Sequence, residues 1–145
     1  MIEARADATL PTGRDEVFTE VTTLENADWL PAVRRIRRLP GPATGLGARY
    51  EVEVGLLGRH LGGVLVCREW SPPARAIYAL EQGMDLTITV SVDEVGRGCR
   101  LELVARYSVG GGLLGSGVER ASSGPARREV ARAVEAFAAR FARTG

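Results

Sequence analysis

The feature that most constrains the fold of this chain is a change of hydrophobic period in its last third. Before that point apolar and polar residues alternate, most regularly over residues 86–92 and 101–107, and a period of two is typical of half-buried strands. Farther on, Val130, Val134 and Phe137 are spaced by four and three residues, which places them on one face of a helix. The pattern therefore predicts a strand hairpin followed by one long amphipathic helix.

The first residue of that helix is left open by the sequence. Glycines at 110–112 end the strand pattern, and we interpret residues 110–117 as a connection to the helix. Two serines and a glycine at 122–124 precede Pro125, and proline suits the first helical position because an N–H there has no intrahelical partner. We expect the helix to begin at Pro125 or to be kinked there.

The first two thirds of the chain predict further strands joined by short turns. Residues 2–10 alternate, and Thr12 followed by Asp15 predicts a capping box for a short helix. A second short helical turn is expected over residues 24–29. Further strands are expected over residues 32–39, 48–54, 60–70 and 74–81. Consecutive strands with short turns favour an antiparallel meander, so we predict an α+β fold: a curved antiparallel sheet of about six to seven strands, two short helices after the first strand, and the long C-terminal helix.

Two pairs of adjacent arginines interrupt the alternation within residues 32–39. A half-buried strand can hold such pairs only if a bulge or a twist absorbs them. The arginines form either a solvated basic edge of the sheet or an anion site, and we favour the solvated edge. Arg106 lies between inward-facing neighbours on a later strand, so we expect it to face solvent or to pair with a carboxylate of a neighbouring strand.

Length and charge narrow the possible classes of protein. A chain of 145 residues fits one domain, which we place at residues 1–145. The net charge is +1 and all 19 basic residues are arginine, so charge gives no reason to expect nucleic acid or an anionic membrane as a partner. No apolar run approaches the roughly 20 residues that span a bilayer, and the first residues lack the apolar core of a signal peptide. We expect a cytoplasmic protein without membrane insertion, as a monomer or homodimer.

Few residues are suited to metal binding or covalent catalysis. The chain has one histidine, His60, and two cysteines, Cys67 and Cys99, none at the spacing of a metal site. We therefore expect neither a metal nor a cofactor. The cysteines lie in predicted strands, where a free thiol behaves as a small hydrophobic group, although a bridge between them is left open.

Several short motifs occur in the order found in a known superfamily. They are Val17-Phe18-x-x-Val21-Thr22, Asn26-x-x-Trp29-x-Pro31, Gly45-x-Gly47-x-x-Tyr50, Gly58-Arg59 and Glu69-Trp70-x-Pro72-Pro73-x-Arg75. Together they make the chain similar to the START/SRPBCC superfamily, and most similar to its polyketide cyclase/dehydrase-like branch. The resemblance covers nearly the whole chain. It implies a helix-grip fold with a deep cavity between the sheet and the C-terminal helix.

The predicted cavity gives a set of candidate site residues. Apolar walls are expected from Phe18, Trp29, Tyr50, Leu86, Ile88, Leu103, Val130, Val134 and Phe137. Candidate catalytic groups are Tyr50, His60 and Tyr107, which could polarise a carbonyl or move a proton. For His60 we favour the alternative of an exposed or hydrogen-bonded residue at a strand end. Because the facing side chains are small or medium-sized, we expect a cavity of roughly 300–1,000 Å³, with its mouth near Trp29 and residues 55–59.

Three functions are compatible with these residues. The first is binding of a small hydrophobic or aromatic molecule in the cavity. The second is catalysis as a polyketide aromatase or cyclase, in which enclosure folds a poly-ketone chain into a productive conformation. The third is a domain that binds another protein through an exposed apolar patch. We rank binding first because the sequence lacks a dense cluster of polar groups.

Overall fold

The alternating segments form strands, and the segments of helical period form helices. The computed structural model describes residues 2–30, 33–42, 44–56, 59–81, 85–108 and 112–142, and only the backbone at 26, 56, 59–61, 112–123, 125 and 142. The elements are β1 (Ile2–Leu10), α1 (Arg14–Thr22), η1 (Leu24–Asn26), β2 (Val33–Arg38), β3 (Arg49–Leu56), β4 (Arg59–Ser71), β5 (Arg75–Leu80), β6 (Asp85–Val95), β7 (Gly98–Ser108) and α2 (Gly112–Ala142).

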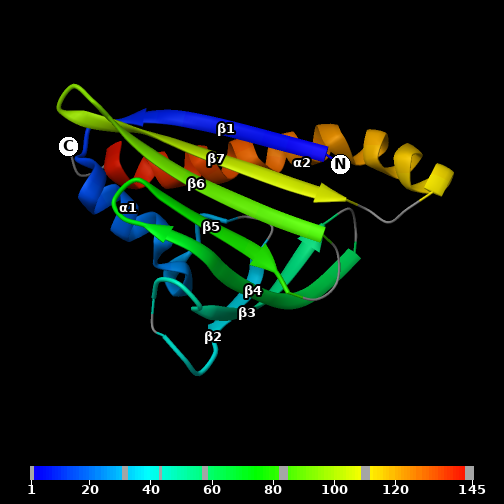
Figure 1. Cartoon of the computed structure of the whole chain (residues 1–145). Coiled ribbons are helices and arrows are strands. Elements are labelled where there is room, and N and C mark those ends of the chain that lie inside the picture. Colours follow the sequence, from blue (N-terminus) through cyan, green and yellow to red (C-terminus); the bar gives the residue numbers. More distant parts are fainter. Residues whose placement is uncertain are drawn as a thin grey trace.

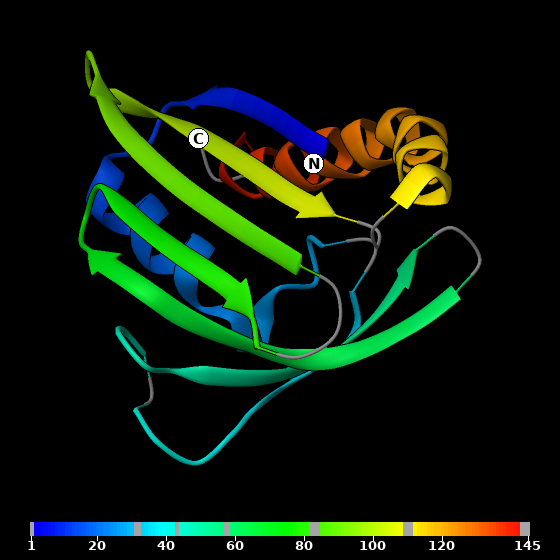
Figure 2. The same cartoon turned by 45° about the vertical axis from the view of Figure 1, so that its right-hand side comes forward.

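The strands of the described residues form one antiparallel sheet of seven strands in the order β1-β7-β6-β5-β4-β3-β2. Strands β2 to β7 follow one another as a meander, and β1 joins the free side of β7, so β1 and β2 are the two edges. Figures 1 and 2 show the sheet curling around α1, with α2 running alongside β1. The predicted α+β class, the curved antiparallel sheet and the two short helices after the first strand are confirmed.

Local irregularities occur where the sequence pattern breaks. The register of β2 against β3 shifts between Val33 and Arg35, so the strand absorbs the paired arginines through an irregularity of the bulge type, one of the two alternatives expected. The turn between β6 and β7 contains two residues, and Gly96 adopts φ of 57° there, a left-handed conformation that favours glycine. The expectation of a capping box before α1 is wrong, because its N-cap residue is Gly13 and no side chain caps the helix.

The expected start of the last helix is also wrong. Helix α2 begins at Gly112 and runs through Pro125 without interruption, so residues 112–117 belong to the helix; residues 110 and 111 lie outside the described part of the chain. Proline and glycine cost helices about 3 and 1 kcal/mol respectively, but packing offsets such local costs. Around this position, buried Ala126 and half-buried Val130 pack with Ile2 and Ala4 of β1.

The core lies on the concave face of the sheet. Helix α1 lies within the curl (Figure 2), and Val17, Phe18 and Val21 are buried there. Helix α2 contacts β1 and, less extensively, β7. It therefore covers one edge of the sheet, whereas α1 contacts β6 and β7, and η1 contacts β2 at the opposite edge. No helix in the described residues is long and apolar enough to cross a membrane.

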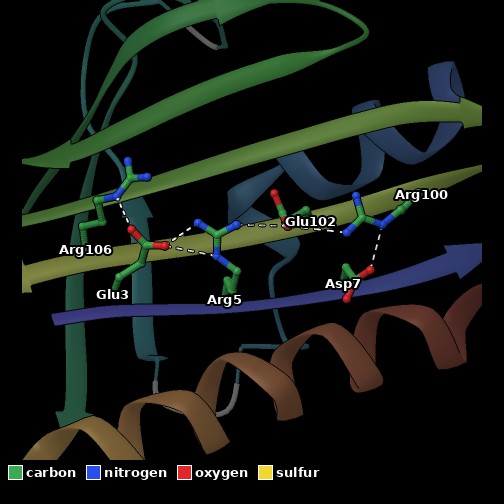
Figure 3. Close-up of polar contacts among 6 residues, drawn as sticks. All are labelled: Glu3, Arg5, Asp7, Arg100, Glu102 and Arg106. Carbon is green, nitrogen blue, oxygen red and sulfur yellow. Dashed lines mark hydrogen bonds and ion pairs between the residues drawn. The ribbon is translucent and has the colours of Figure 1, made fainter.

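The outward faces of β1 and β7 carry a chain of ion pairs (Figure 3). Asp7 and Glu102 are directly opposite in the register, a pairing of like charges that would destabilise the sheet. Arg100 contacts both, at 2.7 Å from Asp7 and 3.6 Å from Glu102. At the other end Glu3 pairs with Arg5 and, at 2.9 Å, with Arg106, so the expected pairing of Arg106 with a neighbouring strand is confirmed.

These exposed pairs affect charge more than stability. The guanidinium of Arg106, followed by that of Arg5, lowers the pKa of Glu3. Solvent screens exposed pairs, so each contributes little to folding. The network keeps the outer face of β1 and β7 charged and locally balanced.

One glycine is required where β1 ends against β7. A methyl group on Gly98 would overlap the carbonyl oxygen of Leu10, whereas one on Gly124 of α2 would meet only the end of the Arg128 side chain, at 3.7 Å. We predict that Gly98→Ala lowers the free energy of unfolding by about 1–3 kcal/mol. The matched Gly124→Ala should raise it by about 1 kcal/mol because alanine favours the helix. Urea unfolding of both variants tests this, and equal effects would contradict it.

Candidate functional site

A cavity of about 210 Å³ lies between the concave face of the sheet, the η1 region and α2. Its wall comprises Val21, Leu24, Trp29, Leu30, Val33, Ile36, Val52, Val54, Gly62, Gly63, Leu65, Tyr78, Leu80, Leu86, Ile88, Val90, Leu103, Ala105, Tyr107, Ala126, Glu129, Val130 and Ala133. Nearly all of these side chains are apolar. The predicted location is therefore correct, but the cavity is smaller than the predicted range.

Small side chains explain why the protein does not fill this space. Helix α2 faces the cavity with Ala126, Val130 and Ala133, and β4 contributes Gly62 and Gly63. These residues project too little to meet across the curl of the sheet. The helix is held against the sheet edge by β1, so it cannot move inward to close the gap without losing that packing.

The structure places the predicted wall residues in two groups. Five of them line the cavity: Trp29, Leu86, Ile88, Leu103 and Val130. Four others, Phe18, Tyr50, Val134 and Phe137, do not line it and are buried in the adjacent core. Whether any of these residues binds a ligand stays a prediction.

Aromatic packing explains the second group. The Phe137 ring lies 5.0 Å from the Trp29 ring, edge to face, and 5.1 Å from the Phe141 ring. Phe18 packs against Trp70 at 5.1 Å. These contacts fill the space beside the C-terminal half of α2. The cavity is therefore confined to the part of the helix before Val134.

The candidate catalytic residues are also separated by the fold. Tyr107 lines the cavity, whereas Tyr50 is buried in the core outside its wall. The side chain of His60 lies outside the described residues. Burial raises the pKa of the Tyr50 hydroxyl, and the nearby Glu25 carboxylate raises it further.

Several lining residues were missed from the sequence. Val33 and Ile36 were assigned to a predicted strand whose arginines were interpreted as a solvated basic edge, and neither was named as a wall residue although both are apolar. Glu129 was not considered, although it is four residues before Ala133 and three after Ala126. That spacing places all three residues on one helix face. It is the feature of the sequence that could have identified Glu129 as a lining residue.

Two lining residues have a buried polar atom without a hydrogen-bond partner among the described residues: Trp29, through Nε1, and Glu129, through Oε2. The other oxygen of Glu129, Oε1, accepts a hydrogen bond of 3.1 Å from Arg132 Nη1. Tyr78 also lines the cavity, and burial raises the pKa of its hydroxyl well above the usual value. The cavity wall is thus almost wholly apolar, and the two unpaired atoms have almost no surface exposed to it.

A polar depression of about 670 Å³ lies beside the cavity and shares Val33 and Ile36 with its wall. Arg34, Arg35 and Arg140 line it together with Glu25, Ala27 and Asp28. Arg140, near the end of α2, pairs with Asp28 and, at 3.9 Å, with Glu20 of α1. The predicted mouth near residues 55–59 falls largely outside the described side chains.

Chemistry through a metal or thiol has little support among the described residues. No three His, Cys, Asp or Glu side chains there lie together as a metal site. Cys67 and Cys99 are free thiols in the core, and burial raises the pKa of both. The expected hydrophobic role of the cysteines is therefore consistent with their positions.

Comparison with protein families identifies the chain. The family model described as "Polyketide cyclase / dehydrase and lipid transport" matches residues 1–144. The chain belongs to this family. It is thus a member of the START/SRPBCC superfamily, and the resemblance found in the sequence motifs is confirmed. The comparison with curated proteins gave no match.

Solved structures share the fold at low sequence identity. The protein TTHA0849 from Thermus thermophilus is 17% identical, with 99% of each chain covered and a TM-score of 0.84. A START superfamily protein from Mycobacterium smegmatis is 12% identical, with 99% of each chain covered and a TM-score of 0.74. The di-domain ARO/CYC BexL from the BE-7585A biosynthetic pathway is 21% identical over 93% of this chain and 46% of its own, with a TM-score of 0.67. At these identities the likeness shows the fold alone.

The buried Tyr78 hydroxyl makes stability depend on alkaline pH. The folded state keeps the Tyr78 proton because its pKa is raised, whereas the unfolded chain releases it near pH 10. Rising pH therefore favours the unfolded state. We predict that the free energy of unfolding falls between about pH 9 and 11. In Tyr78→Phe it should fall less steeply over the same range. Urea unfolding across this range, with the thiols kept reduced, measures both slopes; identical slopes would contradict the prediction.

Proposed function

We propose that this protein binds a small, largely apolar or aromatic molecule in the cavity between the sheet and α2. The observation that carries this proposal is the cavity itself: an almost wholly apolar space of about 210 Å³ within the core. Binding sites for small molecules have predominantly apolar walls, and the wall here is almost wholly apolar. Membership of a family described by polyketide cyclisation and lipid transport agrees with such a ligand.

The cavity volume limits the size of the ligand. An engineered apolar cavity of about 150 Å³ accommodates benzene. A cavity of about 210 Å³ therefore suits a molecule somewhat larger than one benzene ring, such as a fused two-ring aromatic. A long lipid chain would require the cavity to expand.

The second candidate function is catalysis as an aromatase or cyclase on a poly-ketone chain in the same cavity. Tyr78, Tyr107 and Glu129 in the wall favour it, because phenol and carboxyl groups can polarise a carbonyl or move a proton. We rank it second because a poly-ketone chain exceeds the present volume. Tyr50, a weak candidate for such a role, does not line the cavity.

Filling the cavity tests the binding proposal. Ala133 is buried in the cavity wall, whereas Ala136 on the same helix is exposed. We predict that naphthalene raises the melting temperature of the wild-type protein, because a ligand that binds only the folded state stabilises it. Ala133→Phe should abolish this rise by occupying the space, and Ala136→Phe should leave it unchanged.

Melting curves without naphthalene show whether each variant folds, and Val130→Phe provides a second way to fill the cavity if Ala133→Phe does not. No rise in the wild-type protein at saturating naphthalene would refute the proposal. An equal rise in the filled variants would place binding elsewhere and refute it as well.

A further inference from the structure

We propose that the free edge of β2 binds an extended acidic segment of another protein, which joins the sheet as an antiparallel strand beside β2. Strand β2 is last in the sheet order, and no strand of the described residues lies beyond it. The free edge of a sheet is a template for pairing with another chain, and strand addition is a common mode of peptide recognition. Binding at this edge requires no ligand in the cavity, so it is tested separately from the proposed function.

Alternate residues of β2 direct their backbone hydrogen-bonding groups away from the sheet. The N–H of Leu39 donates to the carbonyl oxygen of Arg49 at 2.9 Å, so residue 39 faces β3. The register against β3 is regular from Arg35 to Arg38, and the direction of the backbone groups alternates along a strand. Ile36 and Arg38 therefore direct their N–H and C=O groups toward the free edge, where an added strand would pair with them.

The arginines of β2 determine which kind of strand can join this edge. Four of its six residues are arginine, and among the described residues only Arg37 of these four forms an ion pair, with Glu51 at 3.1 Å. A second copy that paired through its own β2 would bring arginines against arginines, and like charges across strands are destabilising. An acidic segment has the complementary charge, so it is favoured over a second copy of this chain.

Strand β3 shows which sequence complements β2. In the register, residues 51–53, with the sequence Glu-Val-Glu, lie opposite residues 35–37, with the sequence Arg-Ile-Arg. The two glutamates are exposed, whereas Val52 and Ile36 both line the cavity. Acidic side chains thus meet arginines on the outer face, and an apolar side chain meets Ile36 on the inner face. A segment that alternates glutamate with valine would make the same pairs on the free side of β2.

Open space beside the first half of β2 leaves room for such a segment. The polar depression of about 670 Å³ is lined by residues 33–36 of β2 and by Glu25, Ala27, Asp28 and Arg140. Asp28 is already paired with Arg140. Its carboxylate is therefore not needed by the arginines of β2, which can pair with an incoming acidic side chain.

Three blocked peptides of equal length test the sequence requirement. The first, Thr-Tyr-Glu-Val-Glu-Val-Thr, follows the pattern of β3; the second has lysine in place of both glutamates, and the third has the residues of the first in the order Val-Val-Glu-Glu-Tyr-Thr-Thr. Titration into ¹⁵N-labelled protein should shift the amide signals of Ile36 and Arg38 and give dissociation constants. We expect the lysine peptide to bind at least about tenfold more weakly than the first, and the reordered peptide about fivefold more weakly.

Methylation of single peptide nitrogens distinguishes strand addition from attraction between charges. The valine between the two glutamates lies opposite Ile36 and directs its N–H to β2, whereas the glutamates direct theirs away. Methylating the nitrogen of this valine should weaken binding at least about tenfold, because a backbone hydrogen bond is lost and the methyl group separates the strands. Methylating the nitrogen of the first glutamate should leave the dissociation constant within about twofold, since that N–H faces solvent.

Substitutions in the protein assign the binding to β2. Arg35→Gln and Arg37→Gln should each weaken binding of the glutamate peptide about threefold, because each removes one charge that faces a peptide carboxylate. Arg97→Gln is the matched control, since Arg97 is exposed in the turn between β6 and β7. Melting curves show whether each variant folds, and the methylated peptides need no variant.

Three results would overturn the proposal. The first is the absence of any shift at Ile36 and Arg38 with the glutamate peptide, which would mean that the arginines only keep other strands away. The second is equal binding of the reordered or valine-methylated peptide, which would show attraction by charge without strand addition. The third is tighter binding of single-stranded DNA than of the glutamate peptide, which would make the edge a surface for nucleic acid.

Discussion

The close packing of α2 against β1 is the contact on which the rest of the structure depends. Ala4 of β1 and Ala126 of α2 belong to one buried cluster with Ile2 and Tyr107, and side chains this small allow helix and strand to approach closely. With the helix fixed along an edge of the sheet, the middle strands curl around α1 instead of meeting α2. The space that remains between them is the cavity.

The two halves of α2 then have different structural roles. Its C-terminal half carries Phe137 and Phe141, whose rings pack with Trp29 and fill the core, while the preceding turns carry alanine and valine and leave the core hollow. By the cost measured for cavities in other proteins, an empty space of about 210 Å³ forfeits stability on the order of 5 kcal/mol. A ligand that fills the space would recover part of that loss, which links the packing defect to the proposed function.

Sequence reasoning identified the elements that have one buried side. It failed where a residue's role depends on how deeply it is buried or on contacts between elements. Alternation identified β6 and β7 and placed Leu86, Ile88 and Leu103 on the inner face. Helical period placed Val130 and Phe137 on one face too, but it could not show that one lines a cavity and the other fills the core, because the difference depends on Trp29. The start of α2 was misjudged because Pro125 and its neighbours are local signals, whereas packing against β1 extends the helix. Val33 and Ile36 were missed because the arginines beside them dominate the pattern.

The central claim is that an apolar space remains between the sheet and the part of α2 before Val134. Diffraction from crystals held under xenon pressure tests it most directly, because xenon enters empty apolar cavities without requiring hydrogen bonds. The account predicts xenon density among Ile88, Leu103 and Val130, with the surrounding backbone unchanged. Absence of xenon there, with α2 in direct contact with β6, would contradict it.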